Sequence, residues 1–331
     1  MKPPVIGIVG SGSWATALAK LCLNNSQVIN WFIRNENDIL SFKEHQSNPK
    51  YLTSVKFNVN NIRFSRALLS CVQNSDILIL TVPSAFLQPT LSQISKADLQ
   101  SKIIFSAIKG IVPEHNLIVG EYLNKIYEVP FENIGVITGP CHAEEVALEK
   151  LSYLTIASQN ISNAQTVSNL LNCSYLKSTV SDDIYGTEYA AVLKNVIAVA
   201  GGICFGLGYG DNFLAVLVSN AIQEIKRFVD AVHPINRDIN ASAYLGDLLV
   251  TAYSKFSRNR TFGTLIGQGL TVLNAQKEMK MVAEGYYAVK CVYELNKSLK
   301  VNMPITHAVY EIIYNSKTAE SEMEKLTHLL S

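Results

Sequence analysis

The stretch Val5-Ile6-Gly7-Ile8-Val9-Gly10-Ser11-Gly12-Ser13-Trp14-Ala15 joins a short apolar run to the start of a helical pattern. Gly10 permits a tight turn, Gly12 lets the backbone approach a ligand closely, and the small Ala15 lets the helix pack near the strand. A G-x-G-x-x-A turn between a strand and a helix is typical of a site for the pyrophosphate of a dinucleotide, held at the helix N-terminus. The stretch therefore predicts a dinucleotide site. The alternative is a plain glycine turn.

Short β-rich runs alternate with helical patterns through the first half of the chain. They cover residues 5–9, 28–33, 76–82, 103–107, 134–138, 152–157 and 175–180. Continuous apolar strands separated by helical stretches indicate a parallel sheet covered on both faces. We therefore expect residues 1–180 to form an α/β, Rossmann-like, doubly wound domain that binds the dinucleotide.

The pattern after residue 181 is helical only. Helices are expected at about residues 183–203, 212–232, 239–255, 272–296 and 304–315, separated by glycine- and proline-containing loops. The sequence thus predicts an all-helical C-terminal domain over residues 181–331, with the substrate and the catalytic groups in it.

Composition excludes several classes of function. The formal net charge of the 331 residues is +1, so bulk charge gives no argument for nucleic acid or an anionic membrane as partner. The 6 cysteines lack the spacing of a zinc site and indicate reduced thiols, and no metal is expected. The apolar stretch 190–205 is interrupted by Lys194 and Asn195 and falls short of about 20 uninterrupted apolar residues. We expect a soluble cytoplasmic protein.

Arg34 follows the second predicted strand, where the cofactor's ribose is usually recognised. An arginine there can bind a 2′-phosphate, whereas a carboxylate binds a 2′-hydroxyl. Arg34 therefore favours NADPH, and the nearby Glu36 leaves NAD open. A solvated Arg34 with no ligand is the alternative.

Charged side chains interrupt apolar segments at a few positions. Lys194 lies alone in an apolar helix, where burial lowers the pKa of an amine and makes it usable as a general base. Asp247 is equally isolated, and because buried charges are normally paired, it is the candidate partner of Lys194. Lys109 ends a predicted strand, and Ser257-Arg258-Asn259 can hold a phosphate. The alternatives are a snorkelling Lys194, a solvent-facing Lys109 and an exposed basic loop.

These residues together resemble the NAD(P)-dependent glycerol-3-phosphate dehydrogenase family, in particular its soluble bacterial biosynthetic enzyme. The runs that carry the resemblance are Gly10–Ala15, Val82-Pro83-Ser84, Lys109-Gly110, Gly139-Pro140, Leu193-Lys194-Asn195-Val196, Gly210-Asp211-Asn212, Gly246-Asp247-Leu248, Ser257-Arg258-Asn259 and Glu284-Gly285. The chain departs from the family pattern in three places: Cys141 stands where Ser or Thr is usual, Ala15 where Gly is frequent, and Gln88 where Arg is common.

The resemblance implies roles for individual residues. Lys194 and Asp247 would be catalytic. The substrate would be held by Lys109, Gly139, Cys141, Lys194, Asp247, Ser257, Arg258 and Asn259. The cofactor would be held by Gly10, Gly12, Ser13, Trp14, Arg34, Lys109, Ala143, Arg258, Val282 and Glu284.

The resemblance also implies the reaction, which is the reversible reduction of dihydroxyacetone phosphate to sn-glycerol 3-phosphate with NADPH or NADH, in a homodimer that supplies glycerophospholipid synthesis. Two alternatives stay open. A dehydrogenase for a 3-hydroxy acid would anchor a carboxylate instead of a phosphate. A non-enzymatic redox sensor would bind the dinucleotide without needing a buried Lys194.

Overall fold

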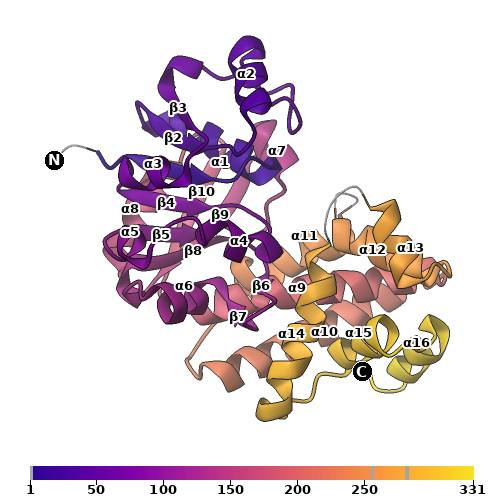
Figure 1. The fold of residues 1–331 in the computed structure, drawn as a ribbon. Helices are drawn as coiled ribbons and strands as arrows, with labels where there is room; N and C mark the ends of the chain where they lie inside the picture. The colour runs from indigo at the N-terminus through magenta and orange to yellow at the C-terminus, as the bar shows by residue number, and fades with distance from the viewer. Residues whose placement is uncertain (1–2, 255–256, 280–282) are drawn as a thin grey trace. The chain divides into compact units, whose positions relative to one another are not determined.

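The computed structural model describes residues 3–254, 257–279 and 283–331. The chain forms two compact units (Figure 1). The first, here called the sheet unit, comprises Met1–Ile108 and Val119–Ile184, and the second, the helical unit, comprises Lys109–Ile118 and Tyr185–Ser331.

The sheet unit is built on one large sheet. Within the described ranges it has eight strands in the order β10-β9-β8-β5-β4-β1-β2-β3, drawn from indigo to magenta in Figure 1. The strands are β1 (Ile6–Val9), β2 (Ile29–Phe32), β3 (Ile62–Ser65), β4 (Ile77–Leu80), β5 (Ile103–Ser106), β8 (Ile134–Thr138), β9 (Ser152–Ser158) and β10 (Leu176–Ser181). The central strands are apolar and buried along their whole length, as expected for a sheet covered on both faces. The predicted fold class is confirmed.

One strand pair differs from the prediction of a parallel sheet. β9 runs antiparallel to β8, whereas the other neighbouring strands are parallel. The connection between β8 and β9 contains only the five-residue helix α7 (Ala143–Ala147). A parallel crossover needs a longer element to travel back along the sheet, so the chain returns in the opposite direction.

Helices cover the sheet. The first, α1 (Ser13–Asn25), follows the glycine turn and packs against α7 and α8 (Ile161–Leu171). The others are α2 (Glu36–His45), α3 (Leu68–Gln73), α4 (Leu87–Leu91), α5 (Lys96–Gln100) and α6 (Val119–Tyr127). Because β1, β2 and β8 share one direction through the sheet, the residues that follow them lie at the same edge, where open α/β sheets bind ligands.

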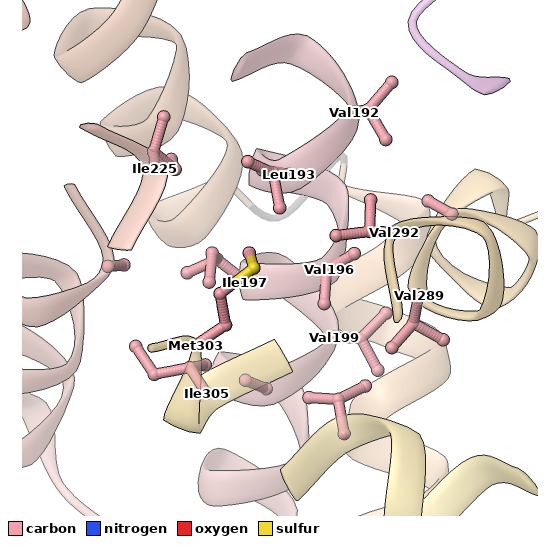
Figure 2. Close-up of a cluster of buried hydrophobic side chains, with 14 of the residues drawn as sticks. Val192, Leu193, Val196, Ile197, Val199, Ile225, Val289, Val292, Met303 and Ile305 are labelled. Carbon is pink, nitrogen blue, oxygen red and sulfur yellow. The ribbon is translucent and has the colours of Figure 1, made fainter. Parts of the chain in front are cut away.

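The helical unit is organised around α9 (Ile184–Gly206). Figure 2 shows its apolar side chains meeting those of other segments: Val192, Leu193, Val196, Ile197, Val199, Ile225, Val289, Val292, Met303 and Ile305. By length and composition α9 could cross a membrane, contrary to the expectation that this segment falls short, but 89% of its most apolar window is buried inside the protein. Burial by other helices thus accounts for its apolar character.

The remaining helices correct several predicted boundaries. They are α10 (Asp211–Val232), a π-helical turn η4 (Ser242–Gly246), α11 (Asp247–Tyr253), α12 (Arg258–Gly267), α13 (Val272–Glu278), α14 (Glu284–Leu299), α15 (Pro304–Tyr314) and α16 (Ala319–Thr327). The single helix expected over 272–296 is two helices, and α12 and α16 were not expected. The unit also contains a two-stranded ribbon, β6 (Ile111–Val112) and β7 (Leu117–Ile118), whose Ile111 and Ile118 join the core of α9.

Helices α9 and α12 touch backbone to backbone through glycines. A Cβ atom added at Gly202 would lie 2.1 Å from the carbonyl oxygen of Arg260, and one at Gly263 would lie 2.1 Å from that of Val199. The glycines one turn further along, Gly206 and Gly267, are equally close to the opposite backbone. The absence of side chains at these four positions therefore sets the distance between the two helices.

Candidate active site

The glycine turn has the geometry that the sequence predicts for it. Gly10 has a φ of +125°, and a Cβ atom there would lie 2.5 Å from Thr81 Oγ1. A side chain is therefore excluded at Gly10 by backbone conformation and by space. The indole Nε1 of Trp31 donates a hydrogen bond to the carbonyl oxygen of Gly10 at 2.7 Å. The turn is thus held from the neighbouring strand β2.

A second support of the turn was not expected from the sequence. Asn48 is buried, and its amide donates to the carbonyl oxygen of Ser11 at 3.0 Å and to Thr16 Oγ1 at 2.8 Å. Asn48 follows α2 without belonging to any recognisable motif, so only the structure could identify it.

The N-terminus of α1 fits the phosphates of a dinucleotide. Gly12 is its N-cap residue; among the described residues, no side chain caps the helix and a Cβ atom on Gly12 would meet nothing within 4 Å. Open space above uncapped N–H groups suits an anion. Ser13 begins the helix, and the buried Nε1 of Trp14 has no hydrogen-bond partner in the described part of the chain. A bound ligand would provide such a partner.

The loop that follows β8 carries three predicted ligand contacts. Gly139 has a φ of +125°, and a Cβ atom there would lie 2.9 Å from the carbonyl oxygen of Tyr153. The thiol of Cys141 donates to the same carbonyl at 3.1 Å. Ala143, which is buried, begins α7. The Cys141 thiol, a weak donor, thus bonds to the chain's own backbone.

The helical unit brings the predicted catalytic residues together. Lys194 lies in α9, Asp247 begins α11, and their side chains are 5% and 1% exposed. Lys194 Nζ is paired with Asp247 Oδ1, which confirms the pairing expected from the sequence. Lys109 Nζ lies 3.3 Å and 3.2 Å from the two carboxylate oxygens of Asp247. One carboxylate therefore lies between two amines.

The protonation of Lys194 is finely balanced in this arrangement. Burial lowers the pKa of Lys194 from 10.5 to about 7; the carboxylate of Asp247 opposes this shift and the charge of Lys109 adds to it. A pKa near neutrality lets one amine both give and take a proton.

A chain of amide hydrogen bonds connects the predicted substrate residues. Asn195 Nδ2 donates to the carbonyl oxygen of Lys109 at 2.7 Å, and Asn259 Nδ2 donates to Asn195 Oδ1 at 2.9 Å. Asn259 Oδ1 then accepts from the backbone N–H of Gly285 at 2.9 Å. We call these bonds the amide relay. Because one N–H and the oxygen of Asn259 are used in it, at most one amide N–H of Asn259 can go to a phosphate.

The other predicted residues of this unit lie at helix ends. Ser257 is the N-cap of α12 and its hydroxyl accepts from Arg260 N at 3.3 Å. Arg258 is exposed at the first residue of α12, and the half-buried Glu284 begins α14. Ser257-Arg258-Asn259 therefore forms a capped helix start, not a loop. The predicted cofactor contact Val282 lies outside the described residues.

Comparisons with known proteins agree with this arrangement. A family model described as the N-terminus of NAD-dependent glycerol-3-phosphate dehydrogenase matches residues 5–164, and one described as its C-terminus matches residues 183–324. This chain belongs to the NAD-dependent glycerol-3-phosphate dehydrogenase family. The family identified from the quoted runs is thereby confirmed, and with it dependence on NAD or NADP.

Individual members of the glycerol-3-phosphate dehydrogenase family resemble the chain over its full length. The glycerol-3-phosphate dehydrogenase (NAD(P)+) of Clostridium botulinum is 33% identical over 97% of this chain and 96% of its own. That of Bacillus licheniformis is 34% identical over 97% and 93%. A crystal structure of glycerol-3-phosphate dehydrogenase from Coxiella burnetii covers 98% of both chains with a TM-score of 0.89 and 26% identity.

Proposed function

We propose that this chain catalyses the reversible reduction of dihydroxyacetone phosphate to sn-glycerol 3-phosphate with NADPH or NADH, and so supplies glycerophospholipid synthesis. The observation that carries the proposal is the buried Lys194–Asp247–Lys109 arrangement in a chain of this family. A buried carboxylate between two amines is expensive to maintain by structure alone, since burying charges costs free energy. Such buried, mutually perturbing charges are typical of a site that binds a polar substrate and transfers a proton to it.

The chemistry divides between cofactor and protein. NADPH or NADH, held by the glycine turn at Gly10 and Gly12, would supply the hydride for C2 of the substrate. In the reducing direction the Lys194 ammonium gives a proton to the oxygen on C2, and in the reverse direction the free amine takes it back. Asp247 fixes the Lys194 amine, and Lys109 shares that carboxylate and offers N–H groups to the substrate oxygens.

The residues that bind the ligands are proposed as follows. Arg258 and Asn259 hold the substrate phosphate near the N-terminus of α12, with Ser257, Gly139 and Cys141 as further contacts. Gly10, Gly12, Ser13, Trp14, Arg34, Lys109, Ala143, Arg258, Val282 and Glu284 contact the cofactor. Residues 1–180 serve dinucleotide binding and residues 181–331 serve the substrate. We also propose a cytoplasmic homodimer.

A direct assay tests the proposed function. Purified protein is mixed with dihydroxyacetone phosphate and either NADH or NADPH, and oxidation of the cofactor is followed by absorbance. We expect turnover with at least one cofactor, and NADPH is favoured because Arg34 follows β2. Turnover restricted to a 3-keto acid would instead support the hydroxy-acid alternative, and binding without turnover would support the redox sensor.

The pH dependence of the two directions should be opposite. Reduction needs the Lys194 ammonium, so its kcat/KM should fall as pH rises above a value near 7. Oxidation needs the free amine, so its kcat/KM should rise through the same value. Asp247→Asn removes the charge that raises the Lys194 pKa and should move both transitions to lower pH. Because Lys194, Asp247 and Lys109 are coupled, the apparent pKa measured in these profiles belongs to the three groups together. Profiles with no shared transition would contradict this role of Lys194.

Arg258→Ala should raise the KM for dihydroxyacetone phosphate about tenfold and also lower kcat, because a charge-assisted phosphate bond and substrate positioning are both lost. Phosphate-free dihydroxyacetone should be a poor substrate that is affected little. The measurement is kcat/KM for both substrates in wild type and variant.

Arg260→Ala is the matched control for this experiment. It removes the same charge from the same helix, but the Arg260 guanidinium donates to the carbonyl oxygen of Tyr253 and lies over the Phe205 ring. Its KM for dihydroxyacetone phosphate should stay near that of wild type. If Arg258→Ala harms both substrates equally, Arg258 serves the cofactor or the fold and the phosphate site lies elsewhere.

A further inference from the structure

Two exposed arginines follow the carboxyl ends of neighbouring strands, at the edge of the sheet where Arg34 was predicted to bind the cofactor. β2 and β3 are parallel neighbours with Phe32 opposite Ser65, and the backbone N–H of Ile33 donates to the carbonyl oxygen of Ser65 at 3.0 Å. Arg66 directly follows Ser65, Arg34 follows Ile33, and both arginines are exposed. The pairing of the strand ends therefore brings the backbone of both arginines to one corner of the sheet unit.

The backbone at Arg66 is held in a defined turn. Ser65 Oγ donates to the carbonyl oxygen of Ala67 at 2.8 Å and accepts from the backbone N–H of Ala67 at 3.1 Å. The hydroxyl thus closes a small ring around Arg66. α3 begins at Leu68, directly after this turn.

The Arg66 guanidinium is paired with a carboxylate, that of Glu36. Arg66 Nη1 lies 2.5 Å from Glu36 Oε2, and the two side chains are 59% and 58% exposed. Glu36 begins α2 directly after its N-cap Asn35, whose side chain accepts from Asn37 N. An ion pair this exposed contributes little to stability, so a stronger anion can replace the carboxylate.

We propose that Arg66 binds the 2′-phosphate of NADPH together with Arg34, and that Glu36 is a built-in competitor that holds Arg66 when no 2′-phosphate is present. The inference rests on the proposed function, since it assumes that the dinucleotide lies at the carboxyl edge of β1 and β2. A phosphate dianion offers more charge and more acceptor oxygens to two guanidinium groups than one carboxylate does. With NADH, which lacks that phosphate, the ion pair between Glu36 and Arg66 remains intact.

Competition between Glu36 and the 2′-phosphate for Arg66 gives a physical reason why the same corner of the sheet unit can accept either cofactor. An unpaired Glu36 near the adenosine ribose would repel a 2′-phosphate, and an unpaired Arg66 would leave excess positive charge beside NADH. Pairing them leaves the charge of Arg34 as the net charge of the three side chains toward NADH, whereas opening the pair supplies a second cation to NADPH. Arg66 therefore sets how strongly the 2′-phosphate is preferred.

The test is equilibrium binding, measured by calorimetry with NADPH, NADH, 2′,5′-ADP and 5′-AMP. Arg66→Gln should raise the Kd for NADPH and for 2′,5′-ADP about tenfold, as expected for loss of a charge-assisted bond, and change that for NADH less than about twofold. Glu36→Gln should lower the Kd for NADPH about threefold. Both effects should shrink in about 1 M salt, because exposed charges are screened.

Arg63→Gln is the matched control. Arg63 is an exposed arginine of the same strand, three residues before Arg66 and away from its carboxyl end. It removes the same net charge and should leave both cofactors within about twofold of wild type. If Arg63→Gln and Arg66→Gln weaken NADPH equally, the effect is general charge and the inference is wrong.

The remaining outcomes separate this inference from the proposed function. A wild-type protein that binds neither NADPH nor NADH would overturn the proposed function itself. Binding of both cofactors, with Arg66→Gln weakening them equally, would overturn only the role of Arg66. A Glu36→Gln variant that binds NADPH no more tightly than wild type would overturn the competition.

Discussion

Lys194→Ala is expected to lower kcat by about 10²- to 10⁴-fold, the range typical of losing a general acid–base group. The loss should appear in both reaction directions, because the same amine gives and takes the proton. Cofactor binding should be nearly unchanged, since Lys194, in α9, is not among the residues proposed to contact the cofactor. Asp247 keeps Lys109 as a partner, so its carboxylate is not left buried alone.

Two variants at this position separate chemistry from packing. Lys194→Ala leaves a space that a small primary amine can enter, so added methylamine or ethylamine should restore part of kcat. Lys194→Met fills the space with an uncharged chain of similar length and should be equally inactive but not rescued. Normal turnover by either variant, with wild-type unfolding behaviour, would remove Lys194 from the mechanism.

Gly202→Ala is expected to destabilise the helical unit by about 3 kcal/mol, in the upper range for overpacking a core. In an exposed helix the same change is stabilising by about 0.5–1 kcal/mol, since alanine is the better helix former. Here the added Cβ would lie 2.1 Å from the carbonyl oxygen of Arg260, a backbone atom that can move only with α12. The sign of the effect is therefore reversed by the contact between α9 and α12.

The neighbouring glycine provides the control. A Cβ atom at Gly201 would lie 3.2 Å from Leu214 Cδ1, the end of a flexible side chain, so Gly201→Ala should cost far less. Urea unfolding is followed by two signals. Circular dichroism reports the helices of both units, whereas the fluorescence of the 2 tryptophans, Trp14 and Trp31, reports the sheet unit alone. A shift in circular dichroism without a matching shift in fluorescence therefore belongs to the helical unit. Equal shifts for Gly201→Ala and Gly202→Ala would contradict the close contact.

Sequence patterns predicted the fold class because its central strands are continuous apolar runs, but they missed elements that depend on tertiary contacts. β3 has 4 residues, as β1 does, but it contains Arg63 and therefore gives no apolar run; it forms because β2 offers it a partner. α12 contains Gly263 and Gly267, which disfavour a helix locally. These glycines are required by the approach to α9, which no local pattern can reveal.

The candidate site was predictable where a charge interrupts an apolar segment. Lys194 and Asp247 stood out for that reason, and the structure pairs them. The supports of the site were less predictable: Asn48 was not singled out from the sequence, and Asn195 was named only as part of a family run, because the partners of an amide in space are needed to assign its role. Arg66 was not recognised as a candidate for a related reason: it follows β3, and the sequence analysis did not predict that strand.

The amide relay has a consequence for how the protein matures. Its hydrogen bonds join residues separated by 86, 64 and 26 positions in the chain. Such long-range closures form late, because the entropy of ordering the intervening chain is lost before any contact compensates for it. During synthesis the glycine turn and β1 leave the ribosome first, yet the relay cannot close until Gly285 has followed. A nascent chain therefore completes its dinucleotide turn well before its amide relay, so that competence for catalysis arrives only after Gly285 of the 331 residues has been synthesised.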